Sequence, residues 1–319
     1  MIDFIRRNYR HFNAGALRRA TEAYIDHINN DGKMFFAMAG AMSSAELGIS
    51  LAPLIRNNKI HAISCTGANL EESVFRLIGN DYYEDLPDYR YFDKEIDEDL
   101  CKNGKRRITD MVFHENSVVD RIAPLLMDKW LKALANNKRY FPHEYFYQVF
   151  KSDEFLPLVQ GELSDCWLLE AAKKDLPIFV AGWEDSTIGN YFAARCKDRE
   201  IDHIILKTGI EYMMQLYDTY EELSSCSNGL GFFQIGGGIS GDFPICVVPS
   251  LKLDLDRNPR QWEYFCQISD SVTSYGSYSG APPNEKITWE KLNVNTPMFV
   301  IESDATIVFP IMASAILES

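Results

Sequence analysis

Two strand-loop-helix units follow each other directly near the start of the chain. The first combines an apolar strand over 33–39 with a helix that runs through Leu47 to Pro53 or beyond. The second combines a strand over 61–65 with a helix from Glu71 onward. Because consecutive units of this kind return the chain to the same edge of a sheet, their strands are expected to lie parallel. The sequence therefore predicts an α/β fold with a mostly parallel central sheet.

Polar residues in the turns of these two units have structural explanations. Ser43 and Ser44 stand before the first helix and can cap it. Asn69 and Glu72 have the spacing of a capping box. Taken alone, these residues indicate helix starts rather than a binding site.

Further units follow later in the chain. A strand over 176–180 is followed by a turn with Asp185 and by a helix that contains Ile188. Asp185 thus lies at the carboxyl end of a strand, where open α/β sheets bind ligands, although it could equally cap the helix. Asp304 has the same kind of position before the closing helix. Additional strands are predicted over 203–206, 231–235 and 297–301.

A glycine run, 236–241, directly follows the strand over 231–235. Gly236, Gly238 and Gly241 have the spacing G-x-G-x-x-G. Glycine suits this place because a side chain would hold a dinucleotide away from the backbone N–H groups that bind its phosphates. The run lies near the C-terminus, whereas a standard dinucleotide-binding domain carries it after the first strand.

The middle of the chain differs in composition from these units. Acidic residues and Tyr dominate the start of 80–117, which we interpret as a peripheral excursion from the sheet. Neither an internal repeat nor a Gly/Ser linker divides the sequence, so 1–319 is predicted to form a single domain. Helices are expected over 118–137, 143–150 and 163–174.

Charge and cysteine content limit the partners and the compartment. The net charge is −14, with 46 acidic against 32 basic residues, which argues against nucleic acid as a partner. Seven widely spread cysteines without metal-ligand spacing indicate a reducing cytosol and no metal site. No apolar run has the roughly 18 residues of a membrane span, and no signal peptide is recognisable. We therefore expect a soluble, cytoplasmic protein.

The stretch from Ser274 to Leu292 combines several reactive residue types. Its glycines and prolines exclude a regular helix or central strand from the first half. Glu285, Trp289 and Lys291 follow, and a carboxylate with an indole face attracts a protonated amine, while a lysine can be a nucleophile. Taken alone, the stretch is also typical of a solvated turn with an aromatic anchor.

This stretch resembles the active-lysine segment of the deoxyhypusine synthase family, in which Gly-Ser-x-Ser-Gly-Ala-x-Pro-x-Glu leads to Trp-x-Lys. The resemblance extends over most of the chain in the same order. It implies a three-layer Rossmann-like α/β fold, NAD as a recycled cofactor, and a homotetramer with active sites between paired subunits. The matching segments are Ser43-Ser44, Thr66–Glu72, Asp185–Gly189, Gly236–Gly238, Gly280–Lys291 and Asp304–Pro310.

The resemblance also implies roles for individual residues. Lys291 would form a Schiff base with the oxidised substrate, which requires attack by its neutral amine. Trp289 and Glu285 would hold the polyamine. The NAD site would be lined by Ser43, Ser44, Thr66, Glu72, Asp185, Gly236, Gly237, Gly238, Asp304 and Ala305.

Three departures from the family pattern fall on the amine half of the site. Asp242 stands where the family has a histidine for proton transfer, Asn190 where it has an acid, and Tyr278 where it has an aspartate. Two carboxylates that would face a polyamine are therefore absent, and one new carboxylate is present. Asp242 is a candidate base, and Asn190 and Tyr278 are candidates for changed substrate contacts.

These residues lead to three functional hypotheses. The first is an NAD-dependent aminobutyl or related aminoalkyl transferase, which would take its group from spermidine or a related amine. The acceptor would be a small amine such as putrescine, as in a homospermidine synthase. The second is a true deoxyhypusine synthase that modifies a lysine of a translation factor. The third is a non-catalytic protein that binds NAD or polyamines. The altered amine pocket favours the first.

Overall fold

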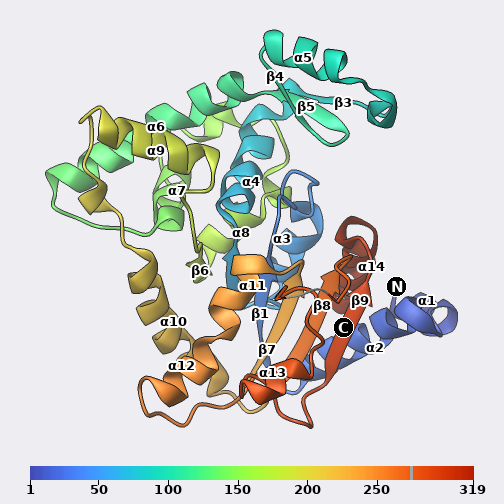
Figure 1. The fold of residues 1–319 in the computed structure, drawn as a ribbon. Coiled ribbons are helices and arrows are strands. Elements are labelled where there is room, and N and C mark those ends of the chain that lie inside the picture. The colour runs from blue at the N-terminus through green and yellow to red at the C-terminus, as the bar shows by residue number, and fades with distance from the viewer. Residues whose placement is uncertain (274–275) are drawn as a thin grey trace.

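The computed structural model describes residues 1–273 and 276–319, so Ser274 and Tyr275 of the lysine-bearing stretch lie outside the described residues. Within the described part of the chain, six strands form one parallel sheet in the order β6-β2-β1-β7-β8-β9 (Figure 1). The predicted α/β class is thus confirmed. The strands are β1 (Lys33–Met38), β2 (Ala62–Cys65), β6 (Ile178–Phe179), β7 (Leu230–Ile235), β8 (Tyr264–Ser269) and β9 (Met298–Glu302).

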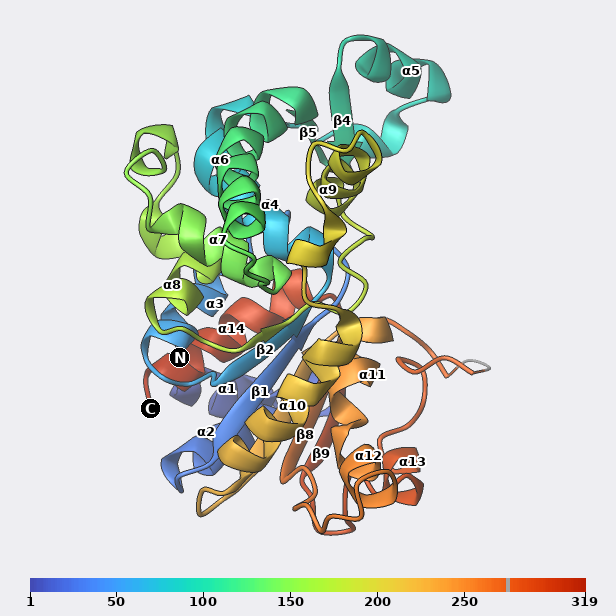
Figure 2. The same ribbon diagram turned by 90° about the vertical axis from the view of Figure 1, so that its left-hand side faces the viewer.

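Helices cover both faces of this sheet and create three layers (Figure 2). One face carries α2 (Phe12–Asn29) and α14 (Ala305–Leu317), flanked by α1 (Ile2–Asn8) and α3 (Gly48–Arg56). The opposite face carries α10 (Gly209–Ser224), α11 (Gly238–Ile245) and α12 (Val247–Leu253). An upper group in Figure 1 consists of α4 (Gly67–Gly79), α6 (Glu115–Ala135), α7 (Pro142–Phe150), α8 (Trp167–Lys173) and α9 (Thr187–Lys197).

Aromatic side chains fill the sheet's interior because its central strands are mostly apolar. Both β7 and β8 are buried along their whole length, as expected for parallel strands covered on two faces. Phe232 stacks between Phe35 and Phe265 of the neighbouring strands, with ring centroids 5.8 and 6.2 Å apart. On the other face Phe309 of α14 packs against Phe233. These rings fix the register of β1, β7 and β8.

The strand order contains a topological switch between β1 and β7. The chain runs outward from β1 through β2 to β6, and outward on the other side from β7 through β8 to β9. Ligands of open α/β sheets bind at the carboxyl ends of the strands next to such a switch. The glycine run follows β7, and Gly40 follows β1, so both stand at the switch. This explains a glycine motif late in the chain: its strand comes fourth but lies beside the first.

Residues 83–114 build a second, smaller sheet apart from the first (Figure 1). Within the described residues its strands pair antiparallel in the order β3-β5-β4, and α5 (Lys94–Lys102) packs against β4. The hydrophobic core is continuous from Ile5 to Ile316, and we propose that 1–319 is one domain. The three strands are β3 (Tyr83–Asp85), β4 (Lys105–Ile108) and β5 (Met111–His114).

The structure corrects one predicted strand and adds one that was not predicted. The predicted strand over 203–206 is wrong, because His203–Ile205 is a single turn of 3-10 helix that the Asp202 side chain caps. Conversely, β8 was not predicted. Its apolar run is interrupted by Gln267, which is buried in the sheet.

Three expected helix caps are also wrong. Leu47, and neither Ser43 nor Ser44, is the N-cap of α3, and it forms no side-chain cap. Thr66 caps α4, so Asn69 and Glu72 form no capping box. At α9 the cap is Ser186, one residue after Asp185. Ser43 and Ser44 instead form hydrogen bonds to residues of α4, and Asp185 is exposed.

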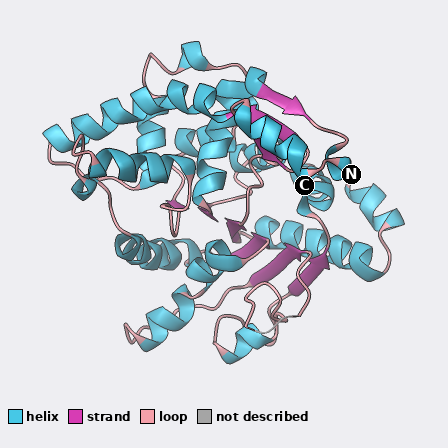
Figure 3. Cartoon of the chain, turned by 45° about the horizontal axis from the view of Figure 1, so that its top comes forward, coloured by secondary structure: helices cyan, strands magenta, loops and turns pink. Residues whose placement is uncertain are grey.

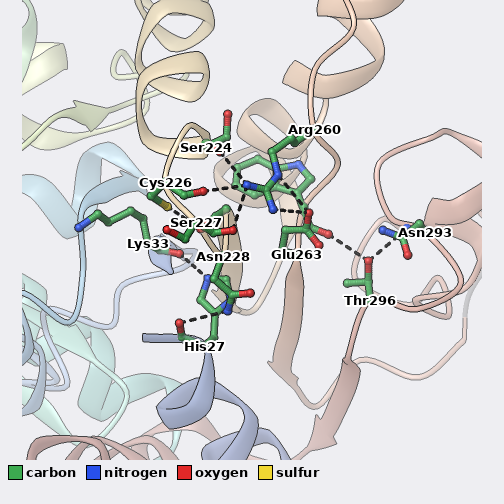
Figure 4. A network of polar contacts seen from close by, with 12 residues as sticks. His27, Lys33, Ser224, Cys226, Ser227, Asn228, Arg260, Glu263, Asn293 and Thr296 are labelled. Carbon is green, nitrogen blue, oxygen red and sulfur yellow. Dashed lines mark hydrogen bonds and ion pairs between the residues drawn. The ribbon is translucent and has the colours of Figure 1, made fainter. Parts of the chain in front are cut away.

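A polar network lies at the amino ends of β1 and β8 (Figure 4). The guanidinium of Arg260 donates to three carbonyl oxygens at the end of α10 and pairs with Glu263 at 3.0 Å. The ring of His27 is buried, with Nε2 2.8 Å from the Lys33 carbonyl oxygen and Nδ1 3.1 Å from Asn228. The chain itself thus supplies hydrogen-bond partners for both the His27 ring and the Arg260 guanidinium.

Helices make up most of the chain outside the sheets (Figure 3). Among the described residues, none of them combines the length and the apolar character needed to cross a membrane. The two ends of the chain lie together, since the amino group of Met1 pairs with the carboxylate of Glu318.

Candidate active site

The glycine turn after β7 leaves the start of α11 open. Gly236 and Gly238 have φ values of +69° and +54°, which favour glycine. A Cβ at Gly238 would meet no heavy atom within 4 Å. In the described structure, no side chain caps the first N–H groups of α11. An uncapped helix start behind a glycine turn fits the pyrophosphate of a dinucleotide.

A pocket of about 270 Å³ lies beside this turn, at the carboxyl ends of β1, β7, β8 and β9. Three of the predicted NAD-site residues, Gly236, Asp304 and Ala305, are brought together here. The carboxylate of Asp304 accepts hydrogen bonds of 2.8 Å from the backbone and hydroxyl of Thr306, so it also caps α14. Asp270, which the sequence did not single out, adds an exposed carboxylate after β8.

Four other predicted NAD-site residues form a cluster between the loop after β1 and the start of α4. Thr66 Oγ1 donates to the carbonyl oxygen of Gly40 at 2.7 Å, and Gly40 lines the 270 Å³ pocket. Ser43 and Ser44 are buried, and Ser44 Oγ donates to the carboxylate of Glu72. Burial raises the pKa of Glu72. The cluster fastens the loop after β1 to α4, and it touches the pocket through Gly40.

A second pocket, of about 440 Å³, surrounds the predicted nucleophile and is named the lysine pocket here. It lies between α11 and the short helix α13 (Glu285–Thr288) with the loop before it. Of the residues predicted for the amine half of the site, it brings together Asp242, Tyr278, Glu285, Trp289 and Lys291.

The turn that ends α13 directs Lys291 into this pocket. Glu290 has a φ of +58°, its N–H bonds to the Ile287 carbonyl oxygen, and the N–H of Lys291 bonds to the Lys286 carbonyl oxygen. These two bonds form a Schellman motif, which usually has glycine at the left-handed position. A residue with a Cβ costs about 1–2 kcal/mol there. The Glu290 carboxylate pairs with Lys252 at 2.7 Å.

The Lys291 amine lies among a carboxylate and two aromatic rings. Its side chain is 9% exposed, and Nζ lies 3.4 Å from Asp242 Oδ1. The ring centroids of Tyr278 and Trp289 each lie 5.9 Å from Nζ. Asp242 itself is half exposed, and the Sγ of Cys246 lies 3.4 Å from its Oδ1. A carboxylate in this position can hold the ammonium and can also accept a proton.

Two buried glutamines attach the lysine-bearing loop to the sheet beside the glycine turn. Gln234 and Gln267 are neighbours in β7 and β8 and share a hydrogen bond of 2.6 Å. The Tyr278 hydroxyl donates to Gln234 at 2.8 Å, and Gln267 donates to the Ser279 carbonyl oxygen at 2.5 Å. A Cβ at Gly237 would lie 2.1 Å from Ser279 Oγ. The loop therefore rests directly on the glycine turn.

Several residues of this site were missed by the sequence analysis. Lys286 and Cys246 line the lysine pocket, and neither belongs to a motif that marks it. For Gln234 and Gln267 a signal existed, because a polar amide in the middle of an otherwise apolar strand needs a buried partner. Their role in holding the loop depends on the pairing of β7 with β8, which the sequence did not predict.

Asp185 and Asn190 are separate from both pockets. They lie around the start of α9 and are exposed. The Asn190 amide donates to the carbonyl oxygens of Glu184 and Ser186, at 2.8 and 2.7 Å. Neither residue lines the 270 Å³ pocket or the lysine pocket. Within one chain, the structure does not bring these two predicted site residues to Lys291.

Comparisons with known proteins agree with the motifs. The family model for deoxyhypusine synthase matches residues 5–316. The chain is similar to a deoxyhypusine synthase-like protein of Nostoc punctiforme, with 28% identity over 99% of this chain and 80% of the relative. It is also similar to a protein of Archaeoglobus fulgidus named "probable deoxyhypusine synthase 2", with 25% identity over 96% of this chain and 94% of the relative.

A solved structure shows a similar fold. It is the crystal structure of a protein from Entamoeba histolytica described as a "putative deoxyhypusine synthase". The TM-score is 0.59 at 10% sequence identity, over 98% of this chain and 91% of the other. The resemblance found in the sequence and the Rossmann-like architecture are thereby confirmed.

Proposed function

Because this chain belongs to the deoxyhypusine synthase family, we propose that it is an NAD-dependent aminobutyl or related aminoalkyl transferase that acts on small polyamines. The observation that carries the proposal is the contact between the lysine-bearing loop and the glycine turn. Ser279 packs against Gly237, and Tyr278 bonds to Gln234 just before that turn. A cofactor at the turn and a substrate bound to Lys291 would therefore share one site.

The proposed cofactor site is the glycine turn with the 270 Å³ pocket. Gly237 and Gly238 would let the pyrophosphate approach the start of α11, and Asp304 with Ala305 would lie beside it. Ser43, Ser44, Thr66 and Glu72 would extend this wall from the β1 side. NAD, when bound, accepts a hydride from the carbon next to the secondary nitrogen of the donor amine and later returns it.

Lys291 is the proposed nucleophile and Asp242 the proposed base. Oxidation of the donor leaves an imine; the neutral amine of Lys291 adds to its carbon, and the carbon–nitrogen bond to the leaving amine breaks. The proton lost by the Lys291 nitrogen ends on the leaving nitrogen, and Asp242 Oδ1, 3.4 Å away, can carry it. An acceptor amine then displaces Lys291 in the same way, and the returned hydride completes the product.

The mouth of the lysine pocket carries the proposed amine contacts. Trp289 is 61% exposed and Glu285 is exposed, and both line the pocket. An indole face and a carboxylate side by side attract an ammonium through cation–π and charge interactions. They would hold one end of the polyamine while its reacting carbon lies at Lys291.

Mass spectrometry of small amines tests the proposed reaction. Purified protein is incubated with NAD, spermidine and putrescine, and the expected products are 1,3-diaminopropane and homospermidine. Diaminopropane without homospermidine would support cleavage and exclude putrescine as acceptor. If all amines stayed unchanged although NAD binds, polyamine transfer would be rejected. A control with the unmodified translation factor, whose acceptor lysine is still free, in place of putrescine detects a true deoxyhypusine synthase.

The role of Asp242 can be tested separately with Asp242→Asn, which keeps the shape of the side chain but removes the base. We expect transfer to slow by about 100-fold or more, in the range of general base catalysis. Turnover at the original rate would exclude Asp242 as the base. Lys132→Met, which removes an exposed charge of α6 outside both pockets, serves as the control.

We further propose that the protein works as a homotetramer with active sites between subunits. Apolar side chains are exposed around the carboxyl ends of the strands, including Ile239 (54%), Val272 (76%) and Ile307 (65%). A second copy placed on this rim would cover them and could supply Asp185 and Asn190, which their own chain leaves outside both pockets. Light scattering after size-exclusion chromatography measures the mass directly, and a monomer would overturn this proposal.

A further inference from the structure

Lys286 is a second lysine amine in the lysine pocket. Its side chain is buried, with only 4% of the residue exposed, yet it belongs to the pocket lining. Its Nζ lies 4.9 Å from the ring centroids of both Phe265 and Tyr278. Lys291 lies over the same Tyr278 ring. The two ammonium groups thus share one aromatic side chain and one cavity.

The Lys286 amine has no polar partner among the residues that the structure describes. No hydrogen bond or ion pair of its Nζ is formed within 1–273 and 276–319, although an ammonium has three donors. The two cation–π contacts offer about 0.5–2 kcal/mol each. Because Lys286 lines the pocket, its Nζ reaches the cavity, and its donors can bind an acceptor there.

The charge that Lys286 carries depends on pH in the neutral range. Burial, followed by repulsion from the Lys291 ammonium, lowers the pKa of Lys286 to about 8. At pH 7 the amine is therefore mostly protonated and positive. Glu285 and Asp242 act in the opposite direction, but Glu285 is exposed at the mouth and Asp242 already lies beside Lys291.

The lysine pocket therefore carries opposite charges at its mouth and in its interior. Its mouth carries the exposed Glu285 and Trp289, which attract a positive charge. Lys291 lies over both Trp289 and Tyr278, and Lys286 lies over Tyr278 and the buried ring of Phe265. A ligand that reaches from the mouth to the sheet would place one end at a carboxylate and the other at the Lys286 ammonium. An amine that carries a carboxylate at its other end matches both charges, whereas a diamine matches only the mouth.

We propose that Lys286 forms an anion-binding subsite at the inner end of the lysine pocket, and that one amine substrate of this protein is an ω-amino acid. Its ammonium would bind at Glu285 and Trp289, and its carboxylate would accept hydrogen bonds from Lys286. This inference rests on the proposed function, because it takes the lysine pocket as the amine site. It assigns the pocket a zwitterionic substrate in place of one of the two polyamines.

Equilibrium binding of three probes with the same four-carbon chain tests the subsite. Putrescine, butylamine and 4-aminobutyrate share one amine and differ at the other end in charge: positive, neutral and negative. Calorimetry with the full-length protein at pH 7 is expected to show 4-aminobutyrate binding at least about tenfold more tightly than putrescine, the value of one charge-assisted hydrogen bond.

Substitution and pH supply two independent checks. Lys286→Met keeps the length of the side chain and should remove the preference, whereas Lys132→Met, on the exposed surface of α6, should retain it. In the unchanged protein, affinity for 4-aminobutyrate should fall as the pH rises from 7 to 9.5, because Lys286 loses its proton through a pKa of about 8. The affinity for butylamine should change little over this range. The pH series needs no variant, so it remains decisive if Lys286→Met does not fold.

Three results would overturn the subsite: tighter binding of putrescine than of 4-aminobutyrate, an unchanged preference in Lys286→Met, or a flat pH series. These binding experiments involve no turnover. Failure of the subsite with formation of homospermidine would leave the transferase proposal intact. A preference for 4-aminobutyrate without any transfer would reject the transferase and keep the anion subsite.

Discussion

The polar network at the amino end of the central sheet and the proposed site differ in how their polar groups are satisfied. At the amino end, Arg260 is surrounded by carbonyl oxygens and Glu263, and His27 has a partner at each ring nitrogen. In the proposed site, the start of α11 lacks a side-chain cap and the Lys286 amine lacks a hydrogen-bond partner among the residues that the structure describes. A buried polar group that its own chain satisfies stabilises the fold, and one left unsatisfied has its partner elsewhere.

This difference predicts a separation of effects. Substitutions in the proposed site should change binding and turnover while the fold persists. Substitutions at the amino end should change the free energy of unfolding without changing turnover per folded molecule. Active sites are commonly drawn from such incompletely satisfied regions.

Lys291→Ala gives the largest expected effect. Removing the proposed nucleophile should lower transfer by at least about a thousandfold, comparable to loss of a covalent nucleophile in other enzymes. The fold should persist, because a methyl group at this position leaves the Schellman turn intact. Product formation by mass spectrometry and the thermal midpoint check the two parts. Transfer at the original rate would remove the covalent mechanism and contradict the assignment of Lys291 to the active site.

Gly237→Ala and Gly238→Ala form a matched pair within the glycine turn of the proposed site. A Cβ at Gly237 would lie 2.1 Å from Ser279 Oγ and displace the lysine-bearing loop, whereas one at Gly238 meets no atom within 4 Å. A shift of about 1 Å can cost 100-fold in rate, so Gly237→Ala should lower turnover by about that factor. Gly238→Ala should chiefly weaken NAD binding, and the φ of +54° at this position adds a backbone cost of about 1–2 kcal/mol.

Steady-state kinetics with varied NAD separates these two glycine variants. Gly237→Ala is expected to lower kcat, and Gly238→Ala to raise the KM for NAD with a smaller change in kcat. If the two variants changed kcat and the KM for NAD to the same extent, the contact between the lysine-bearing loop and the glycine turn would not be the basis of the site.

His27 tests the amino end through pH. Burial lowers the pKa of His27, so the folded state resists the proton that the unfolded state binds below about pH 6.5. Stability is therefore fully present above pH 6.5 and is lost as the pH falls. Relative to His27→Gln, the unchanged protein should lose up to about 1.4 kcal/mol per pH unit.

Urea unfolding of both proteins at pH 7.5, 6.5, 5.5 and 4.5 measures this slope. The comparison of slopes cancels the other titrating groups and any constant cost of the substitution. Parallel stability curves would show that the ring is not held neutral. Turnover of His27→Gln at pH 7.5 should match the unchanged protein.

Much of this protein followed from local sequence. The apolar runs of β1, β2, β7 and β9 identified a parallel α/β sheet, since strands buried on both faces need continuous apolar residues. The glycine run and the segment from Gly280 to Lys291 marked the two halves of the site and the family. Such signals are local: a left-handed turn needs glycine, and the chemistry of an amine pocket needs a lysine, a carboxylate and an indole.

Only the tertiary structure decided which side chains share a surface. The sequence placed Ser43, Ser44 and Glu72 at helix starts, but Ser44 and Glu72 bond to each other across two elements. It mistook 203–206 for a strand and missed β8, whose pairing with β7 aligns Gln234 and Gln267 under the lysine-bearing loop. Lys286 gained its significance only when Phe265 and Tyr278 closed around it. Burial and partnership depend on segments distant in sequence, and these contacts decide whether a polar side chain is satisfied or left to bind a ligand.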